Sequence, residues 1–158
     1  MDSSDKSISF DLEGHCNYCN DISVREKNEY FPNETGKLKL DALMNQVKKS
    51  GHNKDFDCMV GVSGGLDSSY VMYLGYQYGL RMLCVHIDDG LDTEEAKKNI
   101  DRLCKACKAK LVSLVPNMEQ YKGLLKALFF AGVPCVANAQ DNLLLKALWN
   151  TAEKHKVS

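Results

Sequence analysis

Residues 58–74 read CMVGVSGGLDSSYVMYL, and this stretch decides the fold. The apolar run 58–62 is typical of a buried strand, and the apolar residues within 71–74 predict a helix that starts near Ser68. A sharp turn lies between them, in which Asp67 or Ser68 can cap the helix. Because a strand, a glycine turn and a helix start follow one another, the stretch predicts an anion-binding site.

The residues of this turn explain why an anion would bind there. Gly64 and Gly65 let the backbone approach a ligand without a Cβ in the way. The first amides of a helix have no partner inside the helix, and the helix dipole favours negative charge at that end. Ser63, Ser68 and Ser69 add hydroxyl donors.

The charge inside the turn separates it from other phosphate-binding loops. A loop of the type GxxxxGK[ST] places a lysine on the outer phosphates of a nucleotide, whereas this turn has no lysine and contains Asp67. A carboxylate beside phosphates indicates a bridging Mg²⁺, so we expect Mg²⁺ at Asp67. The alternative is an ordinary serine and glycine turn in which Asp67 only caps the helix.

Length and charge narrow the class of protein. The chain has 158 residues, which suits one domain, and its net charge of -1 attracts neither nucleic acid nor a membrane surface. We find no signal-peptide pattern and no apolar run long enough to cross a bilayer, so we expect a cytoplasmic protein. The seven cysteines then indicate free thiols or metal ligands rather than a disulfide framework.

The first 36 residues differ from the rest and form a small cysteine-containing segment. A short strand is expected at 8–12, and residues 20–37 read as a linker or an irregular excursion. Cys16 and Cys19 form a C-x-x-C pair, which supplies half of a tetrahedral zinc site. The alternative is a pair of reduced cysteines that pack against a turn.

Residues 37–158 predict a doubly wound α/β domain with a parallel sheet. Strands are expected at 58–62, 81–87 and 110–115, and helices at 38–50, 68–78, from Asp92 or Thr93, 118–131 and 142–156. Only three strands are present, so the apolar strand 58–62 would form an exposed edge. We therefore expect a fragment of a longer enzyme, or a homo-oligomer or partner that covers this edge.

Several cysteine, leucine and aromatic residues are assigned to the core because they lie in apolar runs or on apolar helix faces. They are Cys58, Cys84, Cys104, Cys107, Leu124, Leu125, Leu128, Phe129, Cys135 and Trp149.

Polar residues at element ends are further site candidates. Ile87 and Asp88 end the second strand, and ligands of open α/β sheets bind beyond the carboxyl ends of the strands. Asp141 and Asn142 precede the last expected helix, where capping and ligand contact are equally good interpretations. His86 is interpreted as a packed strand residue, because the sequence gives it no partner.

The pattern SGGxDS, after a strand and before a helix, resembles the PP-loop of ATP pyrophosphatases, which cleave ATP between the α- and β-phosphates. That superfamily includes NAD synthetases, asparagine synthetases and tRNA-modifying enzymes. Four stretches, FDLEGHCNYC (10–19), VSGGLDSS (62–69), VHIDDG (85–90) and ANAQDN (137–142), resemble the N-acetyl sugar amidotransferases of surface-polysaccharide and lipopolysaccharide biosynthesis. The family normally carries an earlier C-x-x-C pair, which would complete a zinc site, and a further carboxyl-terminal half, and neither is present in this sequence.

This resemblance implies conversion of a sugar acetamido group to an acetamidino group. The amide oxygen attacks the α-phosphate of ATP, pyrophosphate leaves, and ammonia then displaces AMP. A nucleotide-sugar substrate and ammonia-supplying glutaminase and cyclase-like subunits are implied as partners. The resemblance places pyrophosphate on the PP-loop, Mg²⁺ at Asp67 and adenosine beside the second strand. The implied site residues are Ser63, Gly64, Gly65, Leu66, Asp67, Ser68, Ser69, Ile87, Asp88 and Asp141, with Ser63 and Asp67 as the catalytic pair.

Two other functions fit the same loop. One is a tRNA sulfurtransferase of the same superfamily, which would carry a persulfide on Cys104, Cys107 or Cys135. The near-neutral charge counts against an RNA substrate. The other is an ATP-binding module without turnover.

Overall fold

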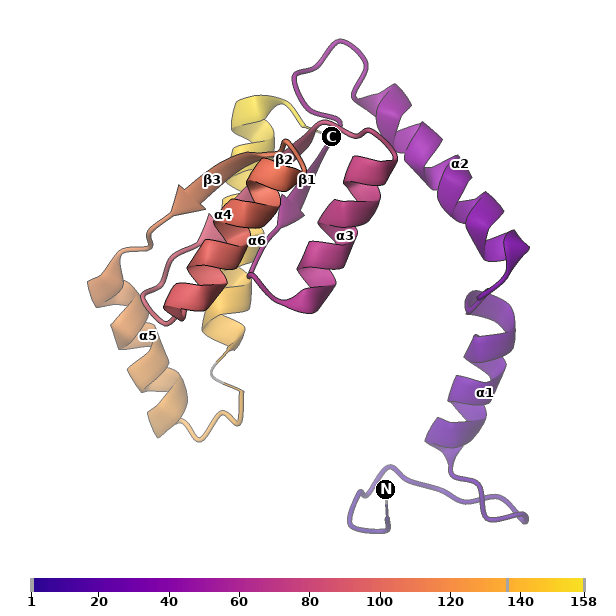
Figure 1. Ribbon diagram of the computed structural model, residues 1–158. Coiled ribbons are helices and arrows are strands. Elements are labelled where there is room, and N and C mark those ends of the chain that lie inside the picture. Colours follow the sequence, from indigo (N-terminus) through magenta and orange to yellow (C-terminus); the bar gives the residue numbers. More distant parts are fainter. Residues whose placement is uncertain (1, 136, 158) are drawn as a thin grey trace. The chain divides into compact units, whose positions relative to one another are not determined.

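The computed structural model describes residues 2–135 and 137–157 (Figure 1). The chain divides into two compact units, with the boundary between Leu43 and Met44. Among the described helices, none is both long and apolar enough to cross a membrane.

The first unit contains helix α1 (Asn17–Glu29) and the first part of α2 (Glu34–Ser50). The strand expected at 8–12 is reduced to one antiparallel bridge between Phe10 and Cys16. The prediction of a linker at 20–37 was wrong, because most of these residues are helical. No residue of α1 is buried, so core packing does not fix this helix.

The second unit holds the sheet and the helices that cover it. In chain order its elements are β1 (Cys58–Gly61), α3 (Leu66–Gln77), β2 (Met82–Ile87), α4 (Glu94–Ala106), β3 (Lys110–Leu114), α5 (Met118–Phe130) and α6 (Asn138–His155). The three strands are parallel in the order β1-β2-β3, which confirms the predicted α/β fold. The strand β1 lies at an edge of this sheet, as expected.

Helices cover both faces of the sheet (Figure 1). On one face Met72 of α3 and Ile100 of α4 pack against Met82 and Cys84 of β2. On the other face Ala147 of α6 packs against alternate residues of the same strand. Every residue of β2 is therefore buried, which explains its unbroken apolar character. Burial of each large side chain contributes about 1.5–3 kcal/mol, so β2 is the centre of the core.

Two helices begin earlier than the sequence predicts. The helix α3 starts at Leu66 rather than near Ser68, and neither Asp67 nor Ser68 caps it, since Gly65 occupies the N-cap position. The helix α6 starts at Asn138, so Asp141 lies in its first turn instead of preceding it. In contrast, Thr93 caps α4 as expected, and its hydroxyl accepts the amide of Ala96.

Four residues assigned to the core are on the surface. Trp149 and Phe129 are 78% and 74% exposed, Leu124 is 45% exposed, and Cys135 is exposed as well. Helical spacing placed Leu124, Phe129 and Trp149 on apolar faces, and an apolar run placed Cys135 in the core, but neither pattern shows which side contacts other elements. Cys84, Cys104 and Cys107 are buried in the core, which confirms their interpretation as small apolar residues.

An ion pair fastens the amino ends of β1 and β2. Asp57 is 5% exposed, and its carboxylate accepts the Arg81 amide at 2.8 Å and the Arg81 Nε at 3.2 Å. The guanidinium of Arg81 also donates to the carbonyl of Gly51 at 2.8 Å. Hydrogen bonds from Arg81 hold the pKa of the Asp57 carboxyl below its usual value, against the opposing effect of burial.

We predict that Asp57→Asn lowers the free energy of unfolding by about 1–3 kcal/mol at pH 7, because it removes a charge-assisted pair from a buried position. The folded pKa of Asp57 is lowered, so this stabilisation is present above the unfolded pKa of about 3.9 and is lost as the pH falls below it. Urea denaturation at pH 7 and pH 3 should show a wild-type advantage that narrows at the lower pH.

The exposed neighbour Asp55 provides the control for this experiment. Asp55→Asn should change the free energy of unfolding by no more than about 0.5 kcal/mol. Equal losses from the two variants would contradict a specific role for the Asp57–Arg81 pair.

Candidate functional site

The glycine turn after β1 is held against the start of α4. Gly64 has a φ of 76°, a conformation that residues with a side chain rarely adopt. A Cβ built on Gly64 would lie 2.7 Å from the carbonyl oxygen of Ala96 in α4. Gly65, in contrast, has a φ of -82°, and a Cβ there would meet only the Ser63 hydroxyl, at 3.4 Å. The two glycines thus have different roles, since only Gly64 is required by the packing.

The serines of the turn lie around the amino end of α3. The hydroxyl of Ser69 donates to the carbonyl of Gly65 at 2.7 Å, and that of Ser68 donates to the same oxygen at 3.3 Å. The amide of Ser63 in turn donates to the Ser68 hydroxyl at 3.4 Å. No side chain caps α3, so its first amides keep their donors for a ligand. Asp67 lies exposed in this first turn, beside the exposed side chain of Leu66.

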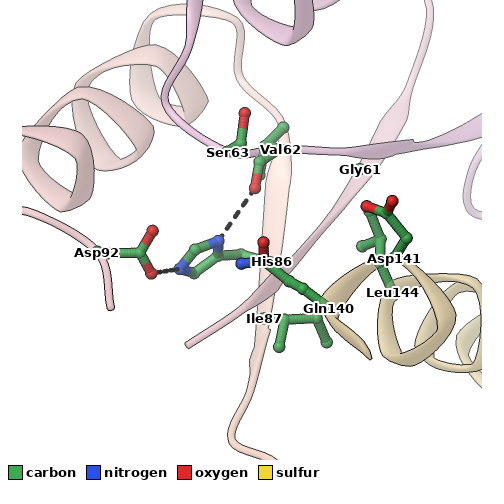
Figure 2. Close-up of a pocket in the computed structure, with 9 residues that line it drawn as sticks. All are labelled: Gly61, Val62, Ser63, His86, Ile87, Asp92, Gln140, Asp141 and Leu144. Atoms are coloured by element: carbon green, nitrogen blue, oxygen red, sulfur yellow. Dashed lines mark hydrogen bonds and ion pairs between the residues drawn. The ribbon is translucent and has the colours of Figure 1, made fainter. Parts of the chain in front are cut away.

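A cavity of about 270 Å³ opens beside this turn, at the carboxyl ends of β1 and β2 (Figure 2). Three residues named from the sequence line it: Ser63 from the turn, Ile87 from β2 and Asp141 from α6. The lining also contains residues that the sequence did not single out as ligand contacts, namely Gly61, Val62, His86, Asp92, Gln140 and Leu144.

Asp88 follows β2 but does not line the cavity. Its carboxylate is 3.3 Å from the Lys97 ammonium of α4, and the Gly90 amide donates to it at 3.3 Å. The Gly90 amide and then the Lys97 ammonium lower the pKa of Asp88, so this carboxyl is held as an anion. The Asp88–Lys97 ion pair therefore lies next to Ala96, the residue against which the glycine turn packs.

His86 is a buried strand residue, as interpreted, and it also has two partners that the sequence did not reveal. Its ring is 8% exposed, its Nδ1 is 3.0 Å from the Val62 carbonyl, and its Nε2 is 3.2 Å from an Asp92 carboxylate oxygen (Figure 2). A carbonyl only accepts, so Nδ1 must carry a proton. The ring therefore ties the residue that precedes the glycine turn to the loop between β2 and α4. A histidine within an apolar strand was the one sequence signal for this contact.

A second buried contact supports the same loop. Asp89 is 2% exposed and accepts hydrogen bonds from the Leu91 amide at 3.0 Å and from the Tyr121 hydroxyl of α5 at 2.8 Å. Burial and the Asp89 carboxylate raise the pKa of Tyr121 to about 12, so its hydroxyl stays protonated and donates. The loop after β2 is thus fastened both to the glycine turn and to α5.

Asp67 and the pair Cys16 and Cys19 are the metal ligands predicted from the sequence, and none of them is in the lining of the cavity. Within residues 2–135 and 137–157, no group of three or more His, Cys, Asp or Glu residues could hold a metal by itself. Mg²⁺ is commonly bound by one or two carboxylates together with substrate phosphates, so the single carboxylate of Asp67 fits that arrangement. Cys16 and Cys19, with sulfurs 3.4 Å apart, provide only two of the four ligands that a structural zinc needs.

Comparison with known proteins gives the fold. No protein-family model and no curated protein sequence matches the chain. A solved NMN synthetase from Francisella tularensis superposes with a TM-score of 0.56 at 17% identity, over 74% of this chain and 50% of that one. An NH3-dependent NAD synthetase from Campylobacter jejuni subsp. jejuni NCTC 11168, in complex with the nitrate ion, superposes with a TM-score of 0.54 at 14% identity. This superposition covers 74% of this chain and 52% of the synthetase.

At these identities the likeness concerns the fold alone. The chain has the α/β fold of these synthetases and spans about half of their length. The likeness therefore confirms the α/β fold that the sequence predicts.

The two glycines of the turn allow a matched test of this geometry. We predict that Gly64→Ala lowers the free energy of unfolding by about 1–3 kcal/mol, because it combines a strained φ with a clash against the backbone of Ala96. Gly65→Ala should change it by less than about 1 kcal/mol, since its φ suits alanine. Urea denaturation measures both, and a Gly65→Ala variant as unstable as Gly64→Ala would contradict the close approach to α4.

Proposed function

We propose that this chain is the ATP-binding part of an amidotransferase that adenylates the N-acetyl group of a nucleotide sugar. One observation carries the proposal: the lysine-free turn of glycines and serines opens at the end of β1, directly beside the cavity that Ser63 lines. The fold of ATP-using synthetases supports the general class, and the four family-like sequence stretches support the sugar acceptor.

In this proposal the turn holds the two outer phosphates of ATP. The uncapped amides of α3 face the negative charge. The hydroxyls of Ser68 and Ser69, which donate to the Gly65 carbonyl in this structure, would turn to the phosphates when ATP binds, and the Ser63 hydroxyl would join them. Adenosine lies along the end of β2 at Ile87 and Asp88, so that the α-phosphate faces the cavity. Asp67 would hold Mg²⁺, which would neutralise phosphate charge. Asp141 lies in the cavity wall, where the acceptor would enter.

The chemistry follows from the weakness of an amide oxygen as a leaving group. That oxygen attacks the α-phosphorus, the bond between the α-phosphorus and its bridging oxygen breaks, and pyrophosphate leaves with the electron pair. Ammonia then adds to the imidate carbon, the carbon–oxygen bond breaks, AMP leaves with that pair, and one ammonia proton passes to solvent. The turn stabilises the charge that develops on pyrophosphate, which is the largest electrostatic demand of the first step.

The ammonia is supplied, in this proposal, by a glutaminase acting with a cyclase-like subunit, as in surface-polysaccharide biosynthesis. The open edge of β1 is the place where further strands or a partner would add to the sheet.

The alternative of a tRNA sulfurtransferase has less support from the side chains. A persulfide carrier must be accessible and easily deprotonated. Cys104 and Cys107 are buried in the core, and burial raises the pKa of both thiols. Among the three thiols proposed for that reaction only Cys135 is exposed, and a pair of carriers is therefore not available.

We predict that the chain releases pyrophosphate and AMP from ATP when a UDP-N-acetylhexosamine and ammonium are supplied, and not when bulk tRNA is supplied. Asp67→Ala should lower this release about 100-fold or more, because the metal loses its protein ligand. Its thermal melting should stay close to that of the wild type, since Asp67 is exposed. The assay quantifies AMP and pyrophosphate by anion-exchange chromatography.

The exposed Asp101, which pairs with Lys105 on α4, gives the control. Asp101→Ala should leave product release unchanged. If Asp67→Ala releases AMP and pyrophosphate as fast as the wild type, Asp67 is not a metal ligand. Release of these products with tRNA but not with the nucleotide sugar would overturn the choice of acceptor.

A further inference from the structure

The outward face of α5 is apolar and is not covered by the described chain. Phe129 and Phe130 are 74% and 83% exposed, and Leu91, from the loop after β2, is 71% exposed. Together with Gly123 they line an apolar groove of about 840 Å³. Single exposed apolar residues are ordinary, whereas a contiguous group of this kind marks a binding surface.

The charges on the same face are unpaired. Glu119, Lys122 and Lys126 border the groove, and none of them forms an ion pair with another described residue. Some exposed charges on other helices are paired within the helix, for example Arg25 with Glu29 in α1. The charges of α5 are therefore available to a partner.

The positions of Glu119 and Lys126 along α5 allow each to face the opposite charge on a second, antiparallel copy of the helix. Glu119 lies near the amino end of α5 and Lys126 lies two turns later, on the same face and equally far from the point between Lys122 and Gly123. Two antiparallel copies of α5 that cross at that point would bring Glu119 of each opposite Lys126 of the other. Gly123 lies at the crossing, where a Cβ would meet nothing within 4 Å, so the backbones can approach closely.

We propose that a second copy of this chain docks on the α5 face in an isologous dimer, with two Glu119–Lys126 pairs around Gly123 and the two phenylalanines beside them. A two-fold axis requires that the same surface serve both partners, and this face meets that requirement. A helix of 13 residues is about 20 Å long, which is small for an interface, so we expect a dissociation constant in the micromolar range.

The dimer would also stabilise the candidate site. Leu91 belongs to the groove and to the loop that carries Asp92 into the cavity. The same loop is fastened to α5 through the hydrogen bond from Tyr121 to Asp89. A partner that covers Leu91 would therefore restrict the loop that holds His86 and Asp92 in place. This coupling is a property of the surface and does not depend on which acceptor the enzyme uses.

Charge reversal tests the proposed pairing. Sedimentation equilibrium of the full chain should show a monomer–dimer equilibrium. Lys126→Glu or Glu119→Lys alone places like charges at both symmetric contacts and should raise the dissociation constant about tenfold or more. The double variant Glu119→Lys/Lys126→Glu restores the opposite charges and should return the constant to within about threefold of the wild type. Lys146→Glu, an exposed reversal on α6, is the control and should leave it unchanged.

If the chain stays monomeric at a protein concentration about ten times the expected dissociation constant, the proposal is overturned. The α5 face would then belong to another partner. Single variants without effect, or a double variant without recovery, would equally contradict it. Amide hydrogen exchange in residues 88–93 should slow as the wild type is concentrated and should stay constant in Lys126→Glu. Equal exchange in both would refute the stabilisation of the loop.

Discussion

The contact between Gly64 and the backbone of Ala96 is the constraint on which the site depends. It brings the turn after β1 against the first turn of α4, so that two elements far apart in the sequence meet at one end of the sheet. Only a residue without a Cβ can make this contact, and the positive φ of Gly64 then directs the chain into α3. The uncapped amides of α3 follow from the same geometry, because Gly65 provides no side chain to bond them.

His86 completes this arrangement from within the sheet. It is a polar residue in a strand that is otherwise an apolar core element, and its ring joins the Val62 carbonyl to the Asp92 carboxylate. Burying such a group is costly unless its polar atoms find partners. Here Nδ1 forms a hydrogen bond with the Val62 carbonyl, whereas Nε2 lies 3.2 Å from the Asp92 carboxylate without forming a hydrogen bond. The carbonyl lies just before the glycine turn and the carboxylate lies just before α4, so the ring spans the same two elements that Gly64 brings together.

The stabilising Asp57–Arg81 ion pair and the candidate site lie at opposite ends of the strands. At the amino ends, the Asp57–Arg81 pair fastens β1 to β2 and satisfies carbonyls of the preceding loop. At the carboxyl ends, the turn, the cavity and the loop after β2 leave amides, hydroxyls and carboxylates open to a ligand. In open α/β sheets ligands bind beyond the carboxyl ends, and this division lets the amino ends be optimised for stability alone.

The sequence by itself determined the parallel α/β fold, because apolar strands, a glycine turn and helical spacing are local patterns. It also predicts an anion site at the turn from Ser63 to Ser69. Tertiary structure alone decided which faces are buried: Trp149 and Phe129 have the spacing of core residues but are exposed, since the face of a helix that meets the sheet depends on the whole packing. The pairing of His86 with Asp92 and the approach of Gly64 to Ala96 were likewise hidden, because contacts between residues distant in the chain leave no periodic signal.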